Sequence, residues 1–364
     1  MWFAVKRLSL GMLLIAAGSG VLLLTDVRPP PGADGRPRPR IAILQQASTP
    51  MLDEGVRGMI DGLAEKGYRN GATADIKTYN AEGDFSTANA IAREITDGSF
   101  DLVITSSTPS LQVVANANRA GRAMHVFGIV ADPFVADVGL DRADPLKHPR
   151  HMVGLSTWMP VTDALRIAKQ MDPGLKRIGV AWNPAESNSR FFISQAKEVA
   201  PQLGIELLEA QVENSSGILE AIRSLLGRGA QAIWVGGDNT VLSALGSVIA
   251  TARQSNIPVF SILPGDPERG TIFDLGFDFY DAGRQVGFLA ADVLGGADTA
   301  AIPIRDVGDV VQRRFLINLK AFQGLKAPWR VPNALLRKAD AVVDQTGIHT
   351  KAVKSPSSFV THDE

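Results

Sequence analysis

Residues 177–190 read Arg-Ile-Gly-Val-Ala-Trp-Asn-Pro-Ala-Glu-Ser-Asn-Ser-Arg. The apolar run from Ile178 to Trp182 has the length of a buried strand. Asn183-Pro184 ends that strand, because proline lacks a backbone N–H and disfavours helical geometry in the residue before it. Ser187 or Asn188 can then cap the helix that follows. The stretch therefore predicts a strand, a polar turn and a helix N-terminus, which is where open α/β sheets bind their ligands.

The same order of strand, polar loop and helix recurs along most of the chain. Strand patterns alternate with helical patterns over residues 40–130 and again over residues 161–263. Such alternation is typical of a parallel sheet with helices on both faces. We therefore predict an α/β protein with two Rossmann-like parallel-sheet lobes, joined by a hinge of several strands.

The two lobes are predicted to meet where the alternation of strands and helices begins again. Strand candidates late in the chain are expected to cross back between the lobes and to complete each of them. Residues 28–39 are rich in Pro, Gly and Arg, which is typical of a linker. The predicted limits are 1–39 for a signal or membrane anchor with its linker, 40–155 with 278–304 for the first lobe, 156–277 with 305–328 for the second lobe, and 329–364 for a C-terminal tail.

The composition excludes several classes of protein and site. The chain has 364 residues, of which 45% are hydrophobic, so it can bury a sizeable core. Its formal net charge of -1 gives no argument for a nucleic-acid partner. The sequence has no cysteine, which excludes disulfides, thiolate nucleophiles and Cys-ligated metals. Its histidines and glycines match no metalloprotease, hydrolase or phosphate-loop motif, so we predict no enzyme, no metal and no cofactor.

The N-terminus has the pattern expected of an export signal. Lys6-Arg7 precedes an apolar run from Leu8 to Leu24, as a basic region precedes the hydrophobic region of a signal peptide. The run of about 17 residues is near the lower limit for a membrane-spanning helix, and no small-x-small cleavage motif follows it. An anchor in the inner membrane formed by residues 8–24, a cleaved signal peptide and a buried core helix are the three interpretations. The first two place the rest of the chain in the periplasm or elsewhere outside the cytoplasm.

Small polar and acidic residues follow most of the predicted strands. The carboxyl ends of parallel strands share one edge of a sheet, so two such edges would form a cleft lined by hydroxyls, amides and helix N-termini. Such a cleft suits a small zwitterion or anion, and its acidic residues can meet an amine. Each residue has an alternative role as a cap or turn residue, and the tryptophan as a core residue. The candidates are Ser48, Thr49, Ser106, Thr108, Asp132, Trp158, Asn183, Glu186, Ser187, Asn188, Asp238, Asn239 and Asp278.

Several of these loops carry recognisable motifs. Residues 182–189 are similar to Tyr-Asn-Pro-x-Glu-x-Asn-Ser, and residues 238–245 read Asp-Asn-Thr-Val-Leu-Ser-Ala-Leu. Together with Ser107-Thr108-Pro109, Ala131-Asp132-Pro133 and residues 276–287, they resemble an ABC-transporter substrate-binding protein family. Its characterised members bind tryptophan, phenylalanine or tyrosine. The resemblance covers about residues 40–328.

The resemblance implies a bilobed fold of the periplasmic-binding-protein type, with a hinged cleft that delivers a small ligand to a membrane permease. The chain departs from the family at Ser48-Thr49-Pro50, where Glu-His-Pro is common, and at Gly236-Gly237, where Pro-Thr is expected. These departures leave the identity of the ligand open. The family's binding positions carry over to Ser106, Thr108, Asp132, Asn188, Asp238, Asn239 and Asp278.

Three functions are compatible with these observations. The first is an exported, monomeric binding component of an ABC-type importer for a small organic solute such as an amino acid. There Asp238 or Asp278 would hold an amine, while Ser106, Thr108 and Asn188 would hold a carboxylate. The second is a membrane-anchored ligand sensor that acts through a partner protein. The third is a cleft enzyme that uses Asp132 and Asp238, against which the absence of a His or Cys constellation counts.

Overall fold

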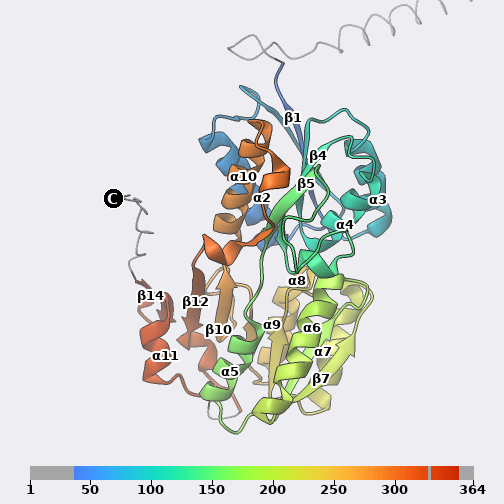
Figure 1. The fold of residues 1–364 in the computed structure, drawn as a ribbon. Coiled ribbons are helices and arrows are strands. Elements are labelled where there is room, and N and C mark those ends of the chain that lie inside the picture. Colours follow the sequence, from blue (N-terminus) through green and yellow to red (C-terminus); the bar gives the residue numbers. More distant parts are fainter. Residues whose placement is uncertain (1–36, 327–328, 352–364) are drawn as a thin grey trace, which may run out of the picture.

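The computed structural model describes residues 37–326 and 329–351, which form two α/β lobes (Figure 1). One lobe is built on a six-stranded sheet and the other on an eight-stranded sheet. The predicted class of two Rossmann-like, mainly parallel-sheet lobes is confirmed. The segment 8–24, predicted as an anchor or signal, lies outside the described residues. Within the described residues, no helix has the length and apolar character needed to cross a membrane.

The sheet of the first lobe is entirely parallel, in the order β11-β5-β4-β3-β1-β2. All five residues of β3 are buried, as expected for a strand covered on both faces. The two buried clusters show that α3 and α4 pack on one face while α2 and α10 pack on the other. The strands are β1 (Arg40–Gln45), β2 (Asp75–Asn80), β3 (Leu102–Ser106), β4 (Met124–Val130), β5 (Met152–Ser156) and β11 (Arg305–Asp306), and the helices are α2 (Pro50–Glu65), α3 (Phe85–Ile95), α4 (Thr108–Ala117), η1 (Pro133–Val135), α10 (Phe279–Leu294) and η4 (Thr299–Ala301).

The sheet of the second lobe has the order β14-β13-β12-β10-β9-β8-β6-β7. Its strands are parallel except where β12 pairs with β10 and β14 pairs with β13. The strands are β6 (Arg177–Trp182), β7 (Glu206–Gln211), β8 (Ala232–Val235), β9 (Val259–Ser261), β10 (Phe273–Phe277), β12 (Arg313–Asn318), β13 (Ala341–Asp344) and β14 (Gly347–Thr350). The helices are α5 (Val161–Met171), α6 (Ser187–Val199), η2 (Pro201–Leu203), η3 (Ser215–Gly217), α7 (Ile218–Gly227), α8 (Asn239–Leu242), α9 (Leu245–Gln254), η5 (Val307–Asp309), η6 (Leu319–Phe322) and α11 (Asn333–Lys338).

The structure places two C-terminal segments differently from the predicted limits. Residues 305–306 pair with β5 and so join the first sheet, although the prediction gave them to the second lobe. Residues 333–350, predicted as part of a tail, form α11, β13 and β14 and extend the second sheet. These elements are short and partly exposed, so their apolar pattern is too weak to read from the sequence. The other limits of the lobes stay a prediction.

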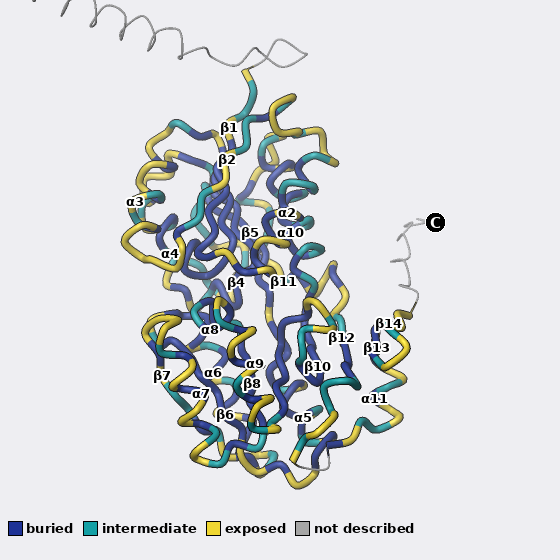
Figure 2. Tube along the Cα trace, turned by 180° about the vertical axis from the view of Figure 1, so that it is seen from behind, coloured by how far each residue is buried: buried dark blue, intermediate teal, exposed yellow. Residues whose placement is uncertain are grey.

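Within the described residues, the chain passes between the two sheets three times. It leaves the first lobe between β5 and α5, returns between β10 and α10, and leaves again between β11 and β12. Several crossings of this kind act as a hinge, because small changes at a few residues rotate one packed lobe against the other. Figure 2 shows the buried strands of both lobes and the more exposed loops and helix surfaces around them.

The return of α10 to the first lobe depends on a seam of glycines. Helices α2 and α10 lie side by side along that lobe (Figure 1). A Cβ atom at Gly283 would lie 2.0 Å from the backbone oxygen of Gly55, and one at Gly58 would lie 2.1 Å from the backbone oxygen of Tyr280. The two helix backbones therefore touch directly, and a side chain at either position would push them apart.

We expect Gly283→Val to lower the free energy of unfolding by about 1–3 kcal/mol or more, because the added side chain overpacks this seam. Urea denaturation of the purified protein measures the change. Gly246→Ala is the control, since a Cβ atom there meets nothing within 4 Å. Gly246 lies in a helix, so the control should be neutral or slightly stabilising. Equal stability of Gly283→Val and wild type would show that the seam is not packed as described.

Candidate functional site

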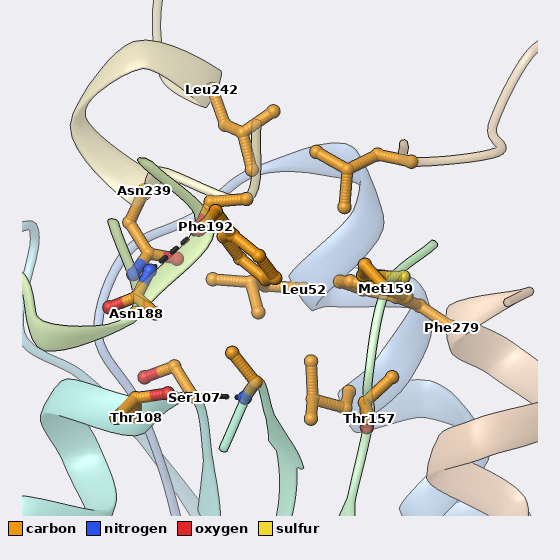
Figure 3. A pocket seen from close by; sticks show the side chains of 14 residues that line it. Leu52, Ser107, Thr108, Thr157, Met159, Asn188, Phe192, Asn239, Leu242 and Phe279 are labelled. Carbon is orange, nitrogen blue, oxygen red and sulfur yellow. Dashed lines mark hydrogen bonds between the residues drawn. The ribbon is translucent and has the colours of Figure 1, made fainter. Parts of the chain in front are cut away.

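A small cavity lies between the lobes, at the carboxyl ends of strands from both sheets (Figure 3). Its volume is about 30 Å³. One water molecule needs about 10–15 Å³, so an organic ligand enters only when the lobes or the lining side chains move. The lining residues are Leu52, Ser107, Thr108, Ile129, Ala131, Thr157, Met159, Asn188, Phe192, Gly237, Asn239, Leu242, Leu263 and Phe279.

Most of the lining is apolar, and its polar groups are neutral. Hydroxyl groups come from Ser107, Thr108 and Thr157, and amide groups from Asn188 and Asn239. In Figure 3, Thr108 of the first lobe and Asn188 of the second lobe lie on opposite sides of the cavity. None of the described residues that line it carries a charged side chain. This lining suits a solute with an apolar body and a polar end that hydrogen bonds can hold.

The N-terminus of α4 forms one polar wall of the cavity. Ser107 is its N-cap, and the Ser107 hydroxyl accepts a hydrogen bond from the backbone N–H of Ser110 at 3.3 Å. Thr108 Oγ1 accepts a hydrogen bond from the backbone N–H of Ala131, also at 3.3 Å. A helix N-terminus favours negative charge, so this wall is suited to a carboxylate.

Two lining residues have backbone angles that side chains rarely adopt. Ser107 has a φ of 121°, and Ile129 has a φ of 53° where the pairing of β4 with β5 shifts register. A positive φ is a clear outlier for a β-branched residue. Such strain persists only where the surrounding structure fixes the backbone, and it concentrates at ligand sites.

The orientation of the Asn188 side chain follows from its partners. Its Nδ2 donates to the backbone oxygen of Gly237 at 2.6 Å and to Glu186 Oε2 at 3.2 Å. Both partners are acceptors, so the amide nitrogen must point toward them. The Oδ1 atom is buried and has no hydrogen-bond partner among residues 37–326 and 329–351. A lone buried acceptor beside a cavity is suited to a donor group of a ligand.

Glu186 fixes the two amides that line the cavity. Its side chain is buried, with 3% of the residue exposed, and it accepts hydrogen bonds at 3.0 and 2.9 Å from the backbone N–H groups of Asn239 and Thr240. It also accepts hydrogen bonds from Asn239 Nδ2 at 2.7 Å and from Thr240 Oγ1 at 2.7 Å. The carboxylate therefore holds the first turn of α8 and positions Asn188 and Asn239.

Asp238 is the N-cap residue of the same helix, α8. It is 2% exposed, and its carboxylate accepts hydrogen bonds from the backbone N–H groups of Asn183 and Val241 and from Ser189 Oγ. Burial raises the pKa of Asp238 to about 7, and the nearby carboxylate of Glu186 adds to this rise. Asp238 does not line the cavity.

The two remaining acidic candidates are also engaged by protein groups. Asp132 is 1% exposed, forms an ion pair with Arg142 and accepts a hydrogen bond from the backbone N–H of Phe134. Asp278 caps α10 and lies 3.3 Å from Arg314. Neither lines the cavity, so each of the four acidic candidates serves as a cap or an ion-pair partner in this structure.

Three of the thirteen predicted residues, Thr108, Asn188 and Asn239, line the cavity together. The other ten do not line it. Ser48 donates to Asp53, Thr49 caps α2, Ser106 is buried at the end of β3, Asn183 Nδ2 donates to Thr240, Trp158 packs edge-on against Phe191, and Ser187 donates to Gln112 of the first lobe at 2.9 Å.

The apolar lining residues were not predicted. Ser107 and Ala131 lie in two of the motifs quoted above, and Thr157 precedes the candidate Trp158, but the apolar side chains look like core residues in the sequence. For Phe192 the sequence did contain a signal. Phe192 follows the candidate Asn188 by four residues and therefore lies on the same face of α6. The missed residues are Leu52, Ser107, Ile129, Ala131, Thr157, Met159, Phe192, Gly237, Leu242, Leu263 and Phe279.

A larger groove of about 950 Å³ lies beside the cavity and shares Leu242 and Phe279 with it. Its lining includes the charged side chains of Asp53, Asp278 and Arg314. Arg314 lies 3.0 Å from Asp281, another lining residue, so charges of opposite sign are paired within the groove. The lining of the groove therefore includes charged side chains, whereas that of the cavity does not.

The chain is similar to known proteins in sequence and in fold. Residues 40–343 match the ABC transporter substrate binding protein family. A tyrosine-binding protein of Clostridioides difficile is 29% identical over 310 residues, which cover 82% of this chain and 88% of that protein. A Streptococcus pneumonia structure in complex with L-Trp is 27% identical, covers 84% of this chain and 100% of its own, and has a TM-score of 0.76.

A ligand-free, open substrate-binding protein from Clostridium difficile, with adhesive properties, is also similar. It is 27% identical, covers 80% of this chain and 96% of its own, and has a TM-score of 0.56. The similar fold and sequence, together with the match over residues 40–343, make this chain a solute-binding protein rather than an enzyme. The chain belongs to the ABC transporter substrate binding protein family.

Proposed function

We propose that this protein captures an amino acid with an apolar side chain in the cavity between its lobes and delivers it to an ABC permease. The observation that carries the proposal is the lining itself, in which apolar side chains surround a few hydroxyl and amide groups contributed by both lobes. The similar proteins support the class of ligand, since one is named for tyrosine and another holds L-Trp.

The two ends of an amino acid head group fit opposite walls of the cavity. The carboxylate would lie at the N-terminus of α4, near the hydroxyl of Thr108. The ammonium group would donate to the unpartnered Oδ1 of Asn188. A zwitterion has no net charge, which agrees with a lining of neutral groups.

The three crossings between the lobes would act as a hinge when the protein captures and releases the solute. The hydrogen bond from Ser187 to Gln112 joins α6 of one lobe to α4 of the other, as expected for a closed arrangement. The TM-score is higher with the L-Trp complex than with the ligand-free, open protein at equal sequence identity, which also supports closure. Closure excludes water and forms a surface across both lobes for a permease.

Export would bring the protein to that permease. The basic and apolar start of the chain supports export to the periplasm, either held at the inner membrane by residues 8–24 or released after cleavage. A retained anchor would raise the effective concentration of the binding lobes near the permease. In either case the protein acts as a monomer on one solute molecule at a time.

A thermal-shift screen of the purified full-length protein against the amino acids tests this proposal. A ligand at 100 times its dissociation constant stabilises the native state by about 2.7 kcal/mol, which raises the melting temperature by a few degrees. We expect one or more amino acids with apolar side chains to do so. A folded protein that no amino acid stabilises would contradict the proposal.

We expect Thr108→Val to weaken binding of the amino acid found in this screen by about 10- to 100-fold, because it removes a hydroxyl from the carboxylate wall. Isothermal titration calorimetry measures the loss. Thr78→Val is the matched control, since Thr78 is exposed on β2. Equal affinities of Thr108→Val and wild type would remove Thr108 from the site.

A further inference from the structure

Phe192 occupies part of the space between the lobes. The residue is 2% exposed, and its ring projects from α6 into the middle of the cavity in Figure 3. It follows Asn188 by four residues, so the group that would hold the ligand and the ring point to the same side of the helix. A ligand held by Asn188 therefore lies next to the ring.

Gly237 makes room for this ring. A Cβ atom at position 237 would lie 2.3 Å from Cε2 of Phe192 and 3.1 Å from Cζ. Gly237 is not among the residues with a positive φ, so its backbone conformation does not require glycine. The space taken by Phe192 is what excludes a side chain at this position.

Phe192 fills part of the cavity, and the absence of a side chain at Gly237 leaves room for its ring. Gly237 lines the cavity and is held by the hydrogen bond from Asn188 Nδ2 to its backbone oxygen. Phe192 also contacts Phe191, with 5.7 Å between the ring centroids, and Phe191 in turn packs on Trp158 at 5.2 Å. The ring of Phe192 is therefore one of a row of three aromatic side chains in contact.

We propose that Phe192, admitted by Gly237, sets the upper limit on the size of the ligand side chain. The inference rests on the proposed function and deepens it, since it selects short aliphatic amino acids over aromatic ones. The cavity of about 30 Å³ beside the ring admits a ligand only after the lobes move, and the ring then limits the room left for the ligand side chain. Hydrophobic pockets discriminate strongly against added bulk only where a rigid group already fills the space, as an aromatic ring does here.

Calorimetric titration of the full-length protein with alanine, valine, leucine, phenylalanine and tryptophan tests this limit. We expect wild type to favour an aliphatic side chain, and Phe192→Ala to shift the affinity ratio at least tenfold toward phenylalanine or tryptophan. Phe192→Leu should shift the ratio in the same direction and serves if Phe192→Ala does not fold. Phe85→Ala is the matched control, because Phe85 is exposed at the start of α3 and does not line the cavity.

A second measurement tests the contact between Phe192 and Gly237 in the absence of ligand. We expect Gly237→Ala to lower the melting temperature of wild type but to be tolerated in the Phe192→Ala background, because the clash is then gone. The size limit would be overturned, and the proposed function left standing, if the affinity ratio changes less than threefold in both Phe192 variants. A change as large in Phe85→Ala would overturn it as well. A folded protein that binds no amino acid in any variant would overturn the proposed function, and the size limit with it.

Discussion

Glu186→Ala is expected to lower the free energy of unfolding by about 3–5 kcal/mol. The substitution removes the acceptor of the backbone N–H groups of the buried Asn239 and the half-buried Thr240 and leaves both without this partner. It also frees the side chains of Asn188 and Asn239, which line the cavity. Loss of stability and loss of ligand binding should therefore occur together.

Urea denaturation of the purified variant measures this effect. Glu198→Ala is the control on the same helix, because Glu198 is exposed, and it should change the free energy by no more than about 0.5 kcal/mol. Glu186→Gln keeps one acceptor oxygen and should fall between wild type and Glu186→Ala. A loss below about 1 kcal/mol for Glu186→Ala would show that the cap of α8 does not depend on this carboxylate.

Asp238 should make stability depend on pH. Its pKa is raised from the ordinary value of 3.8 to about 7, mainly by burial and further by Glu186. The folded protein thus keeps this proton to a higher pH than the unfolded chain does. Between about pH 4 and pH 7 the native state binds more protons, so stability falls as the pH rises through this window. The full range is at most about 4 kcal/mol, since each pKa unit corresponds to 1.36 kcal/mol.

The comparison with Asp238→Asn isolates this contribution. The amide keeps the shape of the carboxyl group and cannot titrate. We expect the free energy of unfolding of wild type, relative to Asp238→Asn, to decline between about pH 4 and pH 7 and to level off above. Denaturant unfolding at a series of pH values measures the difference. Parallel curves for the two proteins would show that Asp238 is charged throughout this range.

The fold could be predicted because buried strands leave a local signal. The run at residues 178–182 is apolar throughout and forms β6, and the proline after it marks where the strand ends. The elements β13 and β14 were missed because they are short and partly exposed, so hydrogen bonds to a neighbouring strand form them more than their own pattern does.

The candidate site could be predicted only in part, for a similar reason. Exit loops pointed to Thr108, Asn188 and Asn239, because small polar residues after strands collect at one sheet edge. The role of Glu186 depends on donors at residues 239 and 240, more than fifty positions along the chain, which spacing does not reveal. The role of Phe192 depends on a glycine in another loop.

A crystal structure of the protein with the amino acid found in the screen tests the central claim, that the solute is held in the cavity between the lobes. We expect density for the ligand between the N-terminus of α4 and Asn188, with its side chain beside Phe192. Ligand density in the neighbouring larger groove, near Asp53 and Asp278, would contradict this claim.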